Sequence, residues 1–275
     1  MGSASGNART ALVTGASSGL GEEFARQLAR RGYDVVLVAR RKDRLDLLTN
    51  NLAALHGVSA EALAADLTQD DDIRRVERRL GADDIALLVN DAGLGTVGEF
   101  AELPVEGEVR QVDLNVRALL QLTHAALRSM IPRQAGAIIN VASMAGYQPV
   151  PYNATYAATK AFVLSLSEAL HEEAKPHGIR VTCLCPGPVR TEFQQVAQIR
   201  AERMRGRQLL RYMAGESAVG VVEAALRASE QGRDVVIPGV MNCAIVHSAQ
   251  TLPRPLVRRL AGAAFEGQAH HQRSV

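Results

Sequence analysis

Short apolar runs alternate along the chain with longer stretches in which apolar residues recur every three or four positions. The short runs have the length and composition of strands, and the longer ones have the periodicity of helices. Strands that are apolar throughout need cover on both faces, and intervening helices join such strands in parallel. The expected strands are Thr10–Val13, Asp34–Ala39, Ala60–Ala64, Ile85–Val89, Ala137–Val141, Arg180–Leu184 and Asp234–Ile237.

This alternation predicts an α/β fold: a doubly wound, Rossmann-like domain with a seven-stranded parallel sheet and helices on both faces. We expect one such domain over residues 10–240, with a substrate lid over 191–215, a disordered tail over 1–9 and a C-terminal extension over 241–275. Helical spacing is seen in Leu20, Phe24 and Leu28, and again in Val109, Val112, Val116, Leu119 and Leu120.

Composition excludes several classes of protein. The 275 residues are 47% hydrophobic, enough for a buried core, and the formal net charge of +2 does not suggest a nucleic-acid partner. Cys183, Cys185 and Cys243 are too few for a disulfide framework, and no Cys/His spacing suits zinc, so no metal is expected. The chain shows neither a secretory signal nor an apolar run of about 18 residues, which predicts a cytoplasmic protein without a transmembrane segment.

The first expected strand runs into the glycine-rich segment Thr14-Gly15-Ala16-Ser17-Ser18-Gly19-Leu20-Gly21, where a helix begins. Glycines allow a sharp turn and a close approach of a ligand to the backbone. The free amides and the dipole of a helix amino end favour a pyrophosphate. A plain tight turn is the alternative, but the position between strand and helix favours dinucleotide binding.

The second expected strand ends at Arg40-Arg41, where an acidic residue would select NAD through the adenosine ribose. Arginine suits a 2′-phosphate instead, because it makes charge-assisted hydrogen bonds to it. The two arginines therefore predict NADP(H) as the cofactor. Arg40 is the stronger candidate for binding the 2′-phosphate and Arg41 the weaker one. The alternative is a solvated basic stretch, since Lys42 and Arg44 follow.

Ser143 follows the fifth expected strand, and Tyr156 and Lys160 lie four residues apart on the next expected helix, hence on one face of it. A free tyrosine ionises at about pH 10, and an adjacent ammonium lowers the pKa of a phenol. A hydroxyl such as that of Ser143 can hold a substrate oxygen beside the phenol. Surface helices often carry such a pair by chance, so the pair alone is weak evidence.

Together, the glycine segment, Asn90-Asp91-Ala92-Gly93, Ser143, the Tyr156/Lys160 pair and Pro186-Gly187 resemble the short-chain dehydrogenase/reductase family over roughly residues 9–240. The resemblance implies an NADP(H)-dependent oxidoreductase that reduces a carbonyl, or oxidises the matching secondary alcohol, by hydride transfer. It makes Tyr156 the general acid or base, Lys160 the partner of the nicotinamide ribose, and Ser143 the group that orients the substrate oxygen. Asn115 matches a fourth catalytic member whose backbone carbonyl holds a water; a purely structural buried asparagine is the alternative.

The resemblance also implies the cofactor contacts. These are Gly15, Ser17, Ser18, Gly19, Leu20, Gly21, Arg40, Arg41, Asp66, Leu67, Asn90, Ala92, Gly93, Tyr156, Lys160, Pro186, Gly187, Val189 and Thr191. One departure is Asp91, where the family usually carries a second asparagine. We expect this change to have a small effect on stability.

The substrate is less well defined. The apolar loop Met144–Pro151 should wall a pocket for a hydrophobic ketone or alcohol. The arginine-rich lid is either a solvated amphipathic helix or a site for an anionic or carrier-attached substrate. The basic amphipathic run Arg254–Phe265 could pack on a second subunit, cover the pocket or touch a membrane. Family members commonly pair through the helices that bear Asn115 and Tyr156, which implies a homodimer or homotetramer.

Two other functions compete with a carbonyl reductase. A scaffold that binds NADP without turnover would tend to lose the tyrosine or the lysine, and both are present. An epimerase or dehydratase of the extended relatives would prefer Gly-x-x-Gly-x-x-Gly and a larger C-terminal domain, and neither is found.

Overall fold

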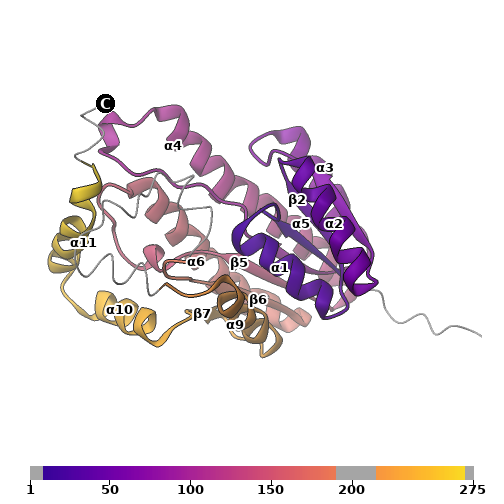
Figure 1. Ribbon diagram of the computed structural model, residues 1–275. Coiled ribbons are helices and arrows are strands. Elements are labelled where there is room, and N and C mark those ends of the chain that lie inside the picture. The colour runs from indigo at the N-terminus through magenta and orange to yellow at the C-terminus, as the bar shows by residue number, and fades with distance from the viewer. Residues whose placement is uncertain (1–8, 190–214, 270–275) are drawn as a thin grey trace, which may run out of the picture.

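The expected alternation of strands and helices is present in the computed structural model, which describes residues 9–189 and 215–269 (Figure 1). The strands are β1 (Thr10–Thr14), β2 (Asp34–Ala39), β3 (Ala60–Ala64), β4 (Ile85–Asn90), β5 (Gly136–Val141), β6 (Ile179–Leu184) and β7 (Val235–Val236). They form one parallel sheet in the order β3-β2-β1-β4-β5-β6-β7. The predicted doubly wound α/β fold is confirmed.

The helices fill the segments between strands and continue beyond β7. They are α1 (Gly19–Arg30), α2 (Lys42–His56), α3 (Asp70–Leu80), α4 (Val105–Val112), α5 (Leu119–Arg133), α6 (Ala154–Ala174), α9 (Ala218–Glu230), α10 (Val240–Thr251) and α11 (Arg254–Ala269). Shorter turns are η1 (Phe100–Glu102), η3 (Met144–Tyr147) and η4 (Lys175–His177), and the π-helical turn η2 (Asp113–Ala118) joins α4 to α5.

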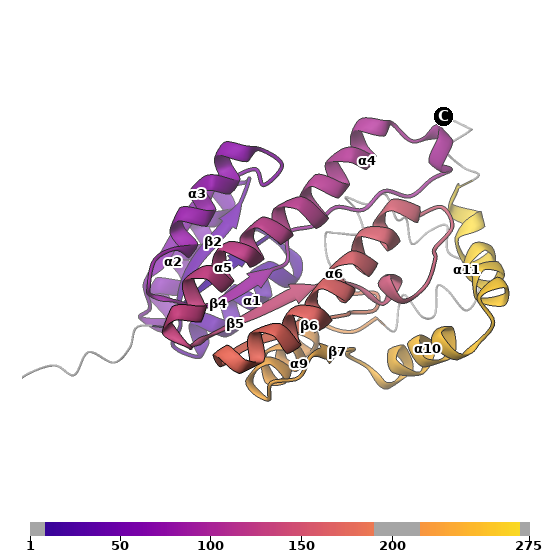
Figure 2. The same cartoon turned by 180° about the vertical axis from the view of Figure 1, so that it is seen from behind.

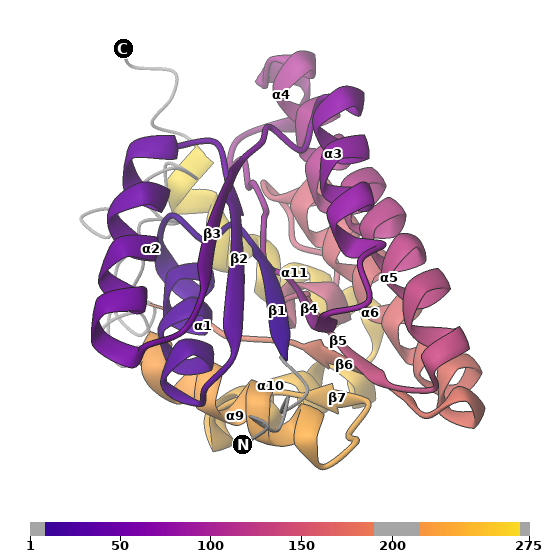
Figure 3. The same ribbon diagram turned by 90° about the vertical axis from the view of Figure 1, so that its right-hand side faces the viewer.

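The core lies in two layers, one on each face of the sheet. Successive strand residues point to opposite faces, so Ala11 and Val13 enter one layer and Leu12 the other. Helices α1, α2 and α9 cover the first layer, and α3 and α5 cover the second. Figure 3 shows α1 and α2 on one side of the sheet and α3 and α5 on the other. This two-sided cover explains why the central strands β1, β2 and β4 are largely apolar, whereas β3 at the sheet edge carries the exposed Glu61.

The sheet reverses its direction of growth at β1. The chain adds β2 and β3 on one side of β1 and then returns to place β4 on the other side. Loops leaving the carboxyl ends of two such strands diverge, and the crevice between them is where open α/β sheets bind ligands. The glycine segment after β1 and the segment after β4 therefore meet at one place.

Two expectations about elements need correction. The seventh strand is shorter than Asp234–Ile237, because only Val235 and Val236 pair with β6 and a turn through Pro238 and Gly239 follows. In the second helical set, Asn115 and Leu119 are buried as expected. The three side chains Val109, Val112 and Leu120 instead face outward, at 55%, 43% and 43% exposure, because the π-helical turn changes the helical phase between α4 and α5.

After β7, α10 and α11 lie beyond the carboxyl ends of the strands, in the orange and yellow part of the chain (Figures 1 and 2). The basic amphipathic run expected from Arg254 onward covers the pocket, which is one of the three placements considered above. Its residues Val257 and Ala261 are buried and line the central cavity. Within residues 9–189 and 215–269, no helix combines the length and the apolarity needed to cross a bilayer.

Candidate active site

The glycine segment leaves β1 at the crevice and packs tightly against the segment after β4. Gly15 has a φ of +72°, and a Cβ at this position would lie 2.9 Å from the Ala92 nitrogen, so a side chain is excluded on both counts. The Thr14 hydroxyl accepts hydrogen bonds from the Asp91 and Ala92 amides, each at 3.1 Å. The Ser18 side chain caps no amide of α1, the Gly21 amide meets the Asp91 carboxylate, and the rest of the first turn is available to an anion.

Arg41 lies over this segment. Its Nη2 donates to the Ser17 hydroxyl at 3.0 Å and to the Ser18 hydroxyl at 2.9 Å, and its Nε donates to the Ser17 hydroxyl at 3.1 Å. Arg40 also borders the cavity, but its guanidinium is not held in this way by the two serines. A guanidinium and two hydroxyls thus converge at the end of β2, a donor set that suits a phosphate.

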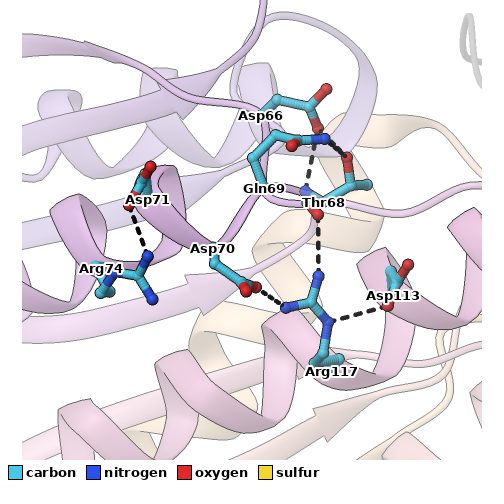
Figure 4. A network of polar contacts seen from close by, with 8 residues as sticks. All are labelled: Asp66, Thr68, Gln69, Asp70, Asp71, Arg74, Asp113 and Arg117. Carbon is cyan, nitrogen blue, oxygen red and sulfur yellow. Dashed lines mark hydrogen bonds and ion pairs between the residues drawn. The ribbon is translucent and has the colours of Figure 1, made fainter.

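The loop after β3 is fixed by a polar network. The Asp66 carboxylate accepts hydrogen bonds from the Thr68 amide at 3.1 Å and hydroxyl at 2.8 Å. Arg117, from the π-helical turn, binds the Thr68 carbonyl and the carboxylates of Asp70 and Asp113 (Figure 4). Burial raises the pKa of Asp66, but the Thr68 hydrogen bonds and the charges of Arg110 and Arg40 outweigh it, and the net pKa is lowered. Asp66 is therefore an ionised acceptor at the cavity wall.

Ser143, Tyr156 and Lys160 meet at the other end of the cavity. Ser143 follows β5 and hydrogen-bonds the Tyr156 phenol, while Tyr156 and Lys160 project from one face of α6. The Lys160 ammonium donates to the Val141 carbonyl at 2.7 Å and lies 5.7 Å from the centre of the Tyr156 ring. Lys160 is only 5% exposed, so its charge acts in a poorly solvated place.

The expected lowering of the Tyr156 pKa is wrong for this structure. Burial is the largest influence and raises the pKa of Tyr156 to about 12, with the Ser143 hydrogen bond lowering it and the charge of Asp91 raising it further. Burial also lowers the pKa of Lys160 to about 8, against the opposing influence of Asp91. Tyr156 is therefore protonated at neutral pH.

Asn115 is buried, as expected, and its side chain has partners. Its amide nitrogen donates to the Leu94 carbonyl at 2.9 Å and to the Thr159 hydroxyl at 3.0 Å, and its oxygen accepts from the Leu94 amide at 2.8 Å. It thus joins the segment after β4 to α6. Its backbone belongs to the π-helical turn, a distortion that is frequent at functional sites.

Asn90, predicted to contact the cofactor, does not line the cavity, whereas the adjacent Asp91 does. The Asn90 amide donates to Thr123 at 3.0 Å and to Asn140 at 2.9 Å inside the protein, so its side chain holds strands and α5 together and does not line the cavity. Asp91, regarded above only as a departure from the family, lines the cavity beside the glycine segment and Lys160. The only sign of this in the sequence was the aspartate at position 91, where the family usually carries a second asparagine.

One cavity of about 770 Å³ joins these groups. The predicted residues along it are Gly15, Ser17, Ser18, Gly19, Leu20, Arg40, Arg41, Asp66, Leu67, Ala92, Gly93, Ser143, Tyr156, Lys160, Pro186, Gly187 and Val189. The apolar wall beyond Ser143 comes from Met144, Val150, Ile245, Leu252, Val257, Leu260 and Ala261. The absence of side chains at Gly15 and the open first turn of α1 leave a cradle that fits a dinucleotide, which agrees with the predicted NADP(H).

A family model described as short chain dehydrogenase matches residues 9–202. The chain belongs to the short chain dehydrogenase family. This agrees with the resemblance in the sequence motifs and with the fold.

Several solved structures and curated relatives are similar to this short chain dehydrogenase. A short-chain dehydrogenase from Sphingobium yanoikuyae in complex with NADPH is 36% identical, with a TM-score of 0.78 over 90% of this chain and 97% of that one. A bulky-bulky ketone specific alcohol dehydrogenase from Comamonas testosteroni is 33% identical, with a TM-score of 0.76 over 89% and 93% of the two chains. A very-long-chain 3-oxoacyl-CoA reductase of Mus musculus is 34% identical over 68% of this chain, which spans 61% of the length of that relative.

Three of the predicted residues that the structure describes are not on the cavity surface. Gly21, Asn90 and Asn115 lie behind it, and Thr191 falls outside the described residues, as does the predicted lid apart from Gly215. Cys183 and Cys185 are fully buried in the sheet, as expected for small hydrophobic residues, with their sulfurs 3.7 Å apart. Among residues 9–189 and 215–269, no three His, Cys, Asp or Glu side chains gather as metal ligands.

Proposed function

We propose that this short chain dehydrogenase binds NADP(H) and reduces the carbonyl group of a hydrophobic ketone, with Tyr156 as the general acid. The observation that supports this most directly is that the Ser143–Tyr156 hydrogen bond and the Lys160 ammonium share one cavity with the glycine segment and Arg41. The NADPH complex of the Sphingobium relative supports the cofactor assignment.

Each residue then has a chemical task. When bound, NADPH supplies the hydride to the carbonyl carbon. Ser143 holds the carbonyl oxygen, and the Tyr156 phenol donates its proton to that oxygen as negative charge develops. Lys160 holds the nicotinamide ribose and stabilises the phenolate left after proton donation. A phenol with a pKa of about 12 is protonated at neutral pH, as the general acid of a carbonyl reduction must be.

The cofactor and substrate occupy different walls in this proposal. Arg41, Ser17 and Ser18 would hold the 2′-phosphate of NADP(H), and Asp66 would contact the adenine. The ketone lies against the apolar wall from η3, α10 and α11, which suits large hydrocarbon substituents. The Comamonas relative is named for bulky ketones and the Mus musculus relative for very-long-chain 3-oxoacyl-CoA. Both names are in keeping with such a wall.

The test is turnover by the Tyr156→Phe variant on a panel of bulky aliphatic, cyclic and aryl ketones, followed by NADPH absorbance. General acid catalysis is worth about 10²–10⁴-fold, so we expect kcat to fall by about that factor while NADPH binding is retained. Tyr33→Phe, a matched change away from the cavity, should leave turnover unchanged. Unchanged turnover in Tyr156→Phe would remove the proposed acid, and NADPH binding without any turnover by the native chain would support the non-catalytic scaffold.

A further inference from the structure

Asp91 brings a carboxylate to the amino end of α1. Its backbone follows β4 and is fixed by the Thr14 hydroxyl, and a Cβ built at Gly21 would lie 2.9 Å from its Oδ2. The Gly21 amide donates a hydrogen bond to this carboxylate. Gly21 is the third residue of α1, so an acidic side chain from the segment after β4 takes one of the free amides of the first turn.

This is the same helix end that the cofactor needs. A carboxylate and a diphosphate are both attracted by the amides and the dipole at a helix amino end, and they repel each other there. The opposing cation is Lys160 on α6, whose ammonium would lie 3.6 Å from a Cβ at Gly93. Asp91 also faces the Tyr156 phenol of α6, and Lys160 also faces the thiols of Cys183 in β6 and of Cys185 just after it.

We propose that Asp91 is a positioning residue with two opposed effects on NADP(H): its side chain anchors the glycine segment through Gly21, and its negative charge weakens cofactor binding, so that binding is coupled to protonation of Asp91. This inference rests on the proposed binding of NADP(H). The protonated carboxyl keeps an acceptor oxygen for the Gly21 amide and loses the repulsion, so it is the better form for the complex.

The direction of the pH dependence follows from this coupling. Burial raises the pKa of Asp91 to about 7, against the influences of Lys160 and the Gly21 amide. The diphosphate raises this pKa further in the complex, so a proton is taken up on binding. NADPH affinity should therefore be higher when Asp91 is neutral and fall as the pH rises through the pKa of the free protein.

Asp91→Asn separates the two effects. It keeps an acceptor oxygen for Gly21 and removes the charge, and it restores the residue that the family usually has, so folding should be retained. Asp91→Ala removes both the acceptor and the charge. Asp46→Asn is the matched control, because it removes an exposed carboxylate on α2 that is paired with Lys42 and does not line the cavity.

The experiment is a fluorescence titration of NADPH into the full chain and the three variants, at about pH 6 and about pH 7.5. If cofactor binding raises the pKa of Asp91 by one unit, linkage predicts that Asp91→Asn binds NADPH about threefold more tightly than the native chain at the higher pH. At the lower pH the two affinities should be almost equal. Asp91→Ala should bind more weakly than Asp91→Asn and melt at a lower temperature, and Asp46→Asn should match the native chain.

Equal affinities of Asp91→Asn and the native chain at both pH values would overturn the charge effect. Equal affinities of Asp91→Ala and Asp91→Asn would overturn the anchoring. A native chain that does not bind NADPH at either pH would instead contradict the proposed function, so the two failures are distinguishable.

Discussion

The Arg41 guanidinium donates to both hydroxyls of the Ser17–Ser18 pair, whereas Arg40 borders the same cavity without that fixation. A guanidinium already held over two hydroxyls loses little conformational freedom when it binds a phosphate. At the scale of single residues, we therefore propose that Arg41, rather than the Arg40 expected from sequence, is the main determinant of NADP(H) over NAD(H).

Arg41→Ala should weaken NADPH binding by about ten- to a hundredfold, because a hydrogen bond to a charged group contributes about 1.5–3 kcal/mol. NADH, which has no 2′-phosphate, should bind about as before. Isothermal titration of both cofactors gives the measurement, and Arg40→Ala is the matched control with a smaller expected loss. A larger loss in Arg40→Ala than in Arg41→Ala would restore the original order.

Single residues also mark the limit of what the sequence could predict. Spacing on a helix was enough to bring Tyr156 and Lys160 into one cavity, because i and i+4 residues share a face. It could not give the sign of the Tyr156 pKa, which depends on burial and on Asp91, a residue 65 positions earlier in the chain. Charges that meet only through the tertiary fold are not visible in local spacing.

At the scale of elements, α11 forms a wall of the cavity with one side and meets solvent with the other. Val257 is buried and lines the cavity, while the adjacent Leu256 is 44% exposed and does not. One residue step along a helix turns the side chain by about 100°, which explains the difference. The sequence showed that this segment was amphipathic, but not which surface its apolar side would meet.

Val257→Trp should fill part of the substrate end of the cavity. We expect the KM for the largest ketones in the panel to rise by about tenfold or more, because overpacking costs about 1–3 kcal/mol, while the NADPH affinity stays the same. Leu256→Trp adds the same volume on the outer side and should change neither value. Steady-state kinetics with a small and a bulky ketone make the comparison, and a parallel loss for both ketones in both variants would contradict the assigned wall.

For most of the strands, by contrast, the sequence was sufficient to predict their positions. Their boundaries were close to those observed, because a strand covered on both faces is apolar at every position. The seventh strand was overestimated since it lies at the edge of the sheet and pairs over two residues only. The valines of α4 were misjudged because a π-helical turn breaks the period on which the prediction relied.

At the scale of the whole molecule, the outward valines of α4 leave an apolar surface on the helices that family members use for pairing. Val105, Val109 and Val112 of α4, with Phe162 of the neighbouring α6, are 38–63% exposed. Exposed apolar side chains that gather on one face mark a protein interface more often than scattered ones do. The homodimer or homotetramer expected from the resemblance stays a prediction, and so does the cytoplasmic location.

Val109→Glu combined with Phe162→Glu should shift the chain toward the monomer, because each change would bury a carboxylate at the interface. Light scattering coupled to size-exclusion chromatography measures the mass. Leu55→Glu, at a 72% exposed position on α2, is the matched control and should keep the native mass. A native chain that is already monomeric, or a double variant with the native mass, would rule out this interface.

The position of α10 and α11 after the last strand has an evolutionary consequence. In the proposed function, the residues that would hold the cofactor lie largely between Thr14 and Gly93, and many of those that would face the hydrocarbon part of the ketone lie in 245–261. Neither of these helices contributes a strand to the sheet. In the proposed function, much of the divergence toward new ketones can therefore be concentrated in these two helices, together with Met144 and Val150, while the dinucleotide cradle is inherited unchanged.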